Sequence, residues 1–79
     1  MANLAARDVE PRAQSALSAS PVFALRELRV KRHGDQLVIS GPVSSFYHKQ
    51  LAQEVVLAIA EGMEVVNSIS VNEPVARHR

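Results

Sequence analysis

The side chains that could do chemistry are few, and their spacing does not bring them together. The histidines stand at positions 33, 48 and 78, and only His33 has another possible metal ligand nearby, Asp35. Two weak ligands on one turn do not make a metal site. The chain has no cysteine, no nucleophile-elbow sequence and no glycine-rich phosphate loop. The sequence therefore predicts no catalytic residues, no cofactor and no bound metal.

One polar cluster could bind an anion. It lies where a helix is expected to begin and consists of Ser44, Ser45, His48 and Lys49. A helix N-terminus attracts anions because its first N–H groups have no partner within the helix. Capping by a serine hydroxyl explains the same residues without a ligand, and this reading is favoured.

The charge distribution singles out one segment. The net charge is only +1, which does not by itself imply a nucleic-acid partner. Segment 24–35 nevertheless carries four basic and two acidic side chains, a local surplus of two. With a lysine further along the chain, its basic residues form the candidate binding surface: Arg26, Arg29, Lys31, Arg32 and Lys49. The alternative is a solvated strand whose charges protect a sheet edge.

Two stretches have the period of amphipathic helices. The first is expected to have Asp8 as its N-cap and to end before Pro21. Its apolar stripe is Val9, Ala13, Ala16 and Leu17. The second is expected to begin after Ser44 or Ser45 and to end at Gly62. Its expected core stripe is Tyr47, Leu51, Val55, Ala58 and Ile59.

Three stretches alternate as strands do. The first two flank a turn at 33–36, which predicts a hairpin. Gly41 and Pro42 are expected to end its second strand, and 64–71 forms a third. One sheet face is then apolar: Leu28, Val30, Leu37, Ile39, Val65, Ile69 and Val71. The sequence thus predicts an α+β two-layer sandwich of order α-β-β-α-β, in which two helices cover one face of a small three-stranded mixed sheet.

The length of 79 residues allows one domain at most. We expect a flexible N-terminus at 1–7, one domain at 8–73 and a flexible tail at 74–79. The longest apolar run, Val55 to Ala60, is too short for a membrane span. Charged residues near the N-terminus interrupt any signal-peptide core.

Several sequence segments match one family in order. They are "LRV" (28–30), "LVISGPVSS" (37–45), "LAQEVVLAIAEGM" (51–63) and "VVNSISV" (65–71). The run from Ala16 to Val71 resembles the BON domain, named after bacterial osmotically inducible and nodulation proteins. Gly41, Gly62 and Asn67 carry the resemblance as structural residues. Arg32 departs from it, since the family usually has an apolar residue there.

The resemblance implies a non-catalytic module in the bacterial envelope or periplasm, binding phospholipid membranes or proteins. Near an anionic membrane each basic residue contributes roughly 1 kcal/mol, so a surplus of two gives about 2 kcal/mol. That is too little to hold a monomer, which makes a protein partner or self-association equally plausible. A nucleic-acid-binding α+β domain is an alternative, but there is no Gly-x-x-Gly loop and aromatic content is only 4%. A structural or oligomerisation module is the remaining alternative.

Overall fold

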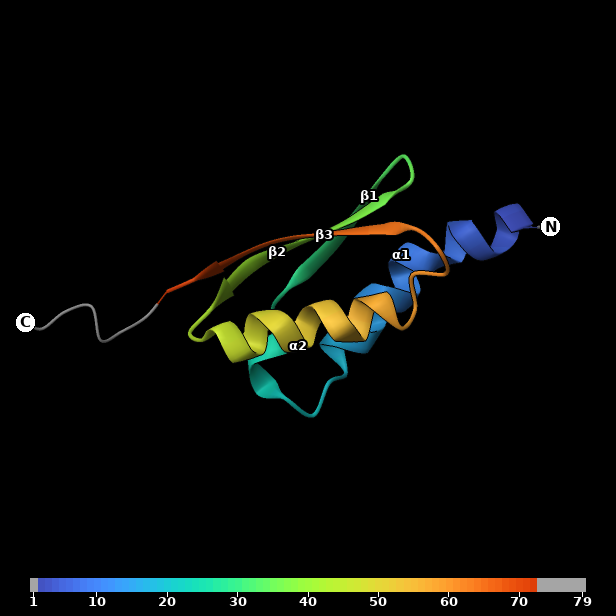
Figure 1. Ribbon diagram of the computed structural model, residues 1–79. Helices are drawn as coiled ribbons and strands as arrows, with labels where there is room; N and C mark the ends of the chain where they lie inside the picture. The colour runs from blue at the N-terminus through green and yellow to red at the C-terminus, as the bar shows by residue number, and fades with distance from the viewer. Residues whose placement is uncertain (1, 73–79) are drawn as a thin grey trace, which may run out of the picture.

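The computed structural model describes residues 2–72, with side chains from Val9 onwards (Figure 1). Its elements are α1 (Ala2–Ser18), the short helix η1 (Phe23–Leu25), β1 (Arg29–His33), β2 (Gln36–Val43), α2 (Phe46–Leu57) and β3 (Glu64–Val71). The sheet has the order β1-β2-β3, with β1 antiparallel and β3 parallel to β2. This confirms the predicted α+β class, element order and mixed sheet.

The core lies between one face of the sheet and the two helices, while the other sheet face is open (Figure 1). Helix α1 contributes three buried side chains four residues apart: Val9, Ala13 and Leu17. The sheet and the segment before it contribute Leu28, Val30, Leu37, Ile39 and Ile69. Val65 and Val71 pack against this core from its margin. The predicted apolar sheet face is therefore correct.

The predicted core stripe of α2 is wrong in part. Tyr47 is 69% exposed and Ala58 is exposed. The buried positions are Ala52, Val56 and Ala60, whereas the predicted Leu51, Val55 and Ile59 are only half-buried. The burial differs from the predicted stripe because α2 contacts both the sheet and α1. Small alanines let α2 approach the sheet closely, and the larger side chains fill its flank instead.

Gly41 and Pro42 do not end β2, which continues to Val43. Proline lacks a backbone N–H group. This loss disrupts a strand only where the N–H would donate a hydrogen bond to a partner strand. In the register, Ser40 pairs with Arg29, the first residue of β1, so no β1 residue stands opposite Pro42. The Gly41–Pro42 pair therefore ends the hairpin with β1, while β2 goes on pairing with β3 through Val43 and Val71.

Two helix ends also differ from expectation. Helix α1 begins at Ala2, so Asp8 is not its N-cap and Pro11 lies inside the helix. Helix α2 ends at Leu57 with Ala58 as its C-cap. Gly62 (φ 89°) instead lies in a tight turn closed by the Met63 N–H bonding to the Ala60 carbonyl. The Ser45 N-cap of α2 is as predicted, since its hydroxyl accepts from the His48 N–H.

Asn67 ties α2 to the sheet. Its Nδ2 donates to the Lys49 carbonyl at 3.0 Å and to Gln53 Oε1 at 3.1 Å. Its Oδ1 accepts from the Ile69 N–H at 3.1 Å. All three bonds are internal, and they place the middle of β3 beneath the middle of α2.

Candidate functional site

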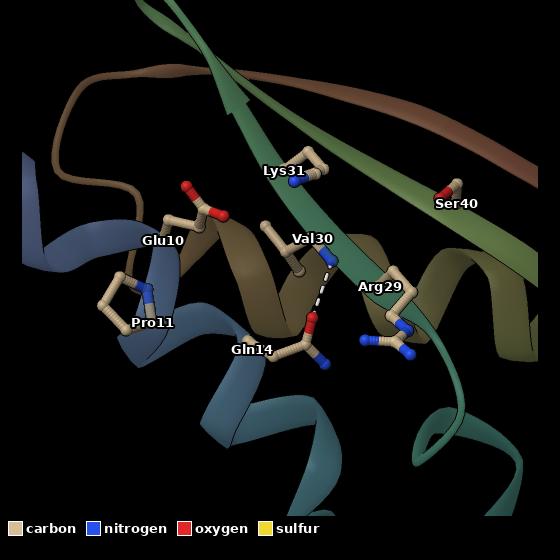
Figure 2. Close-up of a pocket in the computed structure, with 7 residues that line it drawn as sticks. All are labelled: Glu10, Pro11, Gln14, Arg29, Val30, Lys31 and Ser40. Carbon is tan, nitrogen blue, oxygen red and sulfur yellow. Dashed lines mark hydrogen bonds between the residues drawn. The ribbon is translucent and has the colours of Figure 1, made fainter.

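Three of the predicted basic residues line two adjoining clefts between α1 and β1. The larger cleft, about 560 Å³, is lined by Glu10, Pro11, Gln14, Arg29, Val30, Lys31 and Ser40 (Figure 2). The smaller, about 280 Å³, is lined by Gln14, Ser18, Arg26, Glu27, Leu28 and Arg29. Because Arg29 and Gln14 belong to both, the clefts form one continuous surface. We call Arg26, Arg29 and Lys31 the basic edge.

Strand alternation and a local turn position the basic edge. Arg29 and Lys31 are separated by the buried Val30, so both side chains leave the core and are exposed. Arg26 follows η1, where its Nε donates to the Ser20 carbonyl at 2.8 Å. Its guanidinium stands 5.3 Å from the centre of the Phe23 ring, and Phe23 is 72% exposed. The edge thus joins cations to an exposed aromatic ring.

Gln14 holds α1 against β1 between the two clefts. Its Oε1 accepts from the Val30 N–H at 2.8 Å, the bond drawn in Figure 2. Its Nε2 donates to the Leu28 carbonyl at 2.9 Å. These two groups flank Arg29 on the outer side of β1, where a further strand would otherwise bind. One glutamine amide therefore substitutes for a strand at this edge and fixes the backbone that carries Arg29.

Replacing Gln14 with alanine is expected to lower the free energy of unfolding by about 1–3 kcal/mol, because it leaves a part-buried donor and acceptor without partners. Hydrogen exchange of the Val30 amide should accelerate more than that of other β1 amides. The control is Gln50→Ala, since Gln50 is exposed on α2. Equal effects of the two substitutions would contradict the role of Gln14.

The electrostatics of the clefts are mixed. Among the described residues, the only ion pair joins Arg12 to Glu61, at 3.2 Å, so the basic-edge cations stay available to a ligand. Glu10 and Glu27 also line the clefts. The surface therefore holds three cations and two carboxylates. It suits a ligand that presents one or two anionic groups to the cations, rather than a highly charged polyanion.

Arg32 and Lys49 do not belong to this surface. Arg32 follows Lys31 and so turns to the other face of β1, where its Nε donates to the Gly34 carbonyl at 2.9 Å. Lys49 lies on α2, above β3. The structure thus brings together three of the five predicted residues. It adds Gln14, Glu10, Ser40 and Phe23, which the sequence analysis did not single out. Gln14 has no local sequence signal, since its partners are about fifteen residues away.

The residues considered for metal or nucleophilic chemistry do not converge. His33 ends β1 at the exposed hairpin, while His48 Nδ1 lies 3.1 Å from the capping hydroxyl of Ser45. His78 is outside the described residues. Among the side chains that the structure describes, no group of three or more His, Asp or Glu residues is placed to hold a metal ion.

No helix in the described part of the chain is long and apolar enough to cross a bilayer. No protein-family model matches the sequence, and no curated protein matches it either.

Proposed function

We propose that the protein is a non-catalytic binding module of BON type that contacts an anionic phospholipid surface through its basic edge. The observation that carries the proposal is that Arg26, directly after η1, and two cations of β1 line adjoining clefts that share Arg29. Among the described residues, no carboxylate forms an ion pair with these cations. The sequence resemblance to the BON domain supports the same class of function.

The chemistry of the edge fits a lipid headgroup. A guanidinium presents a planar fork that can bind two phosphate oxygens at once, and a lysine adds a mobile point charge. Phe23, 72% exposed beside Arg26, can enter the headgroup region, where aromatic rings are favoured. A cation next to an exposed aromatic ring thus favours binding at a membrane surface.

The test compares two double charge reversals with the same change in net charge. Wild-type protein is expected to bind vesicles that contain anionic phospholipid and not to bind neutral vesicles. Added salt should weaken this binding, because it shortens the Debye length from its physiological value of about 8 Å. Arg29→Glu with Lys31→Glu should remove binding. The control, Arg32→Glu with Lys49→Glu, should retain most of it, because these residues lie outside the basic edge.

Equal losses in the two double variants would show that only net charge matters and would contradict the assignment. Binding to an acidic peptide but not to anionic vesicles would replace the lipid with a protein partner. Chemical-shift mapping of Arg26 and Phe23 locates the contact in either case.

A further inference from the structure

The two edge strands of the sheet differ in how they are protected from pairing with another chain. The outer side of β1 is covered by the Gln14 amide and carries three basic residues: Arg29, Lys31 and Arg32. Charged side chains and covering groups are devices that keep an edge strand from pairing with another chain. β3 is the other edge, eight residues long, and its only charged residue is Glu64, at one end. Among the eight residues of β3 there is no lysine and no proline.

The hydrogen-bond pattern shows which groups β3 presents. The Glu64 N–H bonds to the Asp35 carbonyl and the Asn72 N–H to the Val43 carbonyl, both towards β2. Even-numbered residues of β3 therefore face β2, and by alternation the odd-numbered ones turn their backbone N–H and C=O groups outwards. These are Val65, Asn67, Ile69 and Val71. The structure gives one of these groups a local partner, the Ile69 N–H, which donates to Asn67 Oδ1.

Two apolar side chains on the flank of α2 above this edge are exposed. Phe46 is 68% and Leu57 50% exposed. At 100° per residue both fall within about 40° of Gln53, and the Oε1 of Gln53 accepts a hydrogen bond from Asn67 of β3. Phe46 and Leu57 thus lie on the β3 side of α2, one at each end of the helix.

We propose that this protein forms a symmetric homodimer by antiparallel pairing of β3 with β3 of a second copy. Antiparallel pairing holds the two Glu64 side chains at opposite ends of the junction, whereas parallel pairing would set them side by side. The shared faces match when the two-fold axis passes through a residue rather than between two residues. Pairing over the full length of β3 places this axis at the centre of the strand, at Asn67 or Ser68. Asn67 lies beneath the middle of α2, so the same axis brings Phe46 of each copy opposite Leu57 of the other. The surface is therefore self-complementary along both the strand and the helix, as a two-fold interface requires.

Charge variants at Ser68 test the dimer without touching the basic edge. Ser68 is exposed on the open face at or beside the proposed axis. In sedimentation equilibrium the wild-type mass should rise from 8.6 kDa towards twice that value with concentration. Ser68→Lys and Ser68→Glu should each stay monomeric, since like charges then meet across the junction. An equimolar mixture of the two should dimerise again.

Two further variants complete the experiment. Ser40→Lys, on the same open face but in the central strand, should dimerise as wild type does. Phe46→Glu, which leaves the sheet untouched, should lose the dimer while keeping its circular dichroism spectrum. A wild-type protein that stays monomeric, a mixture that fails to dimerise, or equal effects at Ser68 and Ser40 would overturn the proposal. A dimer lost only on changing Arg29 and Lys31 would also overturn it.

Discussion

Replacing Leu37 with alanine is expected to lower the free energy of unfolding by about 2–5 kcal/mol. Leu37 is fully buried in the central strand, between β1 and β3 and beneath the helices. Truncation loses the transfer free energy of the side chain and leaves a cavity that close neighbours cannot fill. Small domains have total stabilities near the lower end of about 5–15 kcal/mol. The variant should therefore melt far below the wild type, as measured by circular dichroism.

The matched control for Leu37 is the same substitution at Leu51. Leu51 is only half-buried, on the flank of α2, so Leu51→Ala should cost clearly less. Chemical denaturation at low protein concentration, where any dimer is dissociated, gives the comparison for the monomer. If Leu51→Ala destabilised the protein as much as Leu37→Ala, the half-buried position assigned to Leu51 would be wrong.

Replacing Gly41 with alanine is the second large expected effect. A Cβ atom there would lie 2.9 Å from Leu28 Cδ2, and the backbone has φ 127°, which other residues rarely adopt. Strain of this kind costs about 1–3 kcal/mol, and overpacking a core adds about 1–3 kcal/mol. The free energy of unfolding should fall accordingly in a denaturant titration.

Two comparisons separate the contributions at Gly41. Gly62→Ala meets a positive φ but no atom within 4 Å of its Cβ, so it should show the strain without the clash. Gly41→Ala combined with Leu28→Ala should be less destabilising than the sum of the single changes, because the truncated leucine makes room. Strict additivity would show that the two residues do not touch.

Strand periodicity made the sheet predictable from the sequence. Polar and apolar residues alternate over 28–31, and Leu37 and Ile39 continue the apolar face after a short turn. A one-residue shift would turn these apolar side chains to water. The helix stripe of α1 at Val9, Ala13 and Leu17 was predictable for a similar reason. In each case the pattern is local, and one face is clearly more apolar than the other.

The rest depended on contacts between distant residues. Which side chains of α2 are buried depends on its two neighbours, the sheet and α1. The sequence of 46–57 alone does not reveal these neighbours. The continuation of β2 past Pro42 depends on where β1 begins. The basic edge depends on Gln14, whose amide bonds to β1 from another element. Composition identified the cations, but only the fold shows that Arg32 turns away from Arg29 and Lys31.

The placement of β1 and β3 at opposite edges of the sheet has a consequence for attachment. If two copies pair along β3 as proposed, their sheets join into one, and the two basic edges lie at its opposite ends. A membrane bound through the basic edge, as also proposed, would then be bound at two sites of one dimer. The second contact becomes intramolecular, so avidity can raise attachment by about 10²–10⁴ over a single site without any new contact. Weak, salt-sensitive sites would thereby act as a reversible sensor of protein concentration at the membrane.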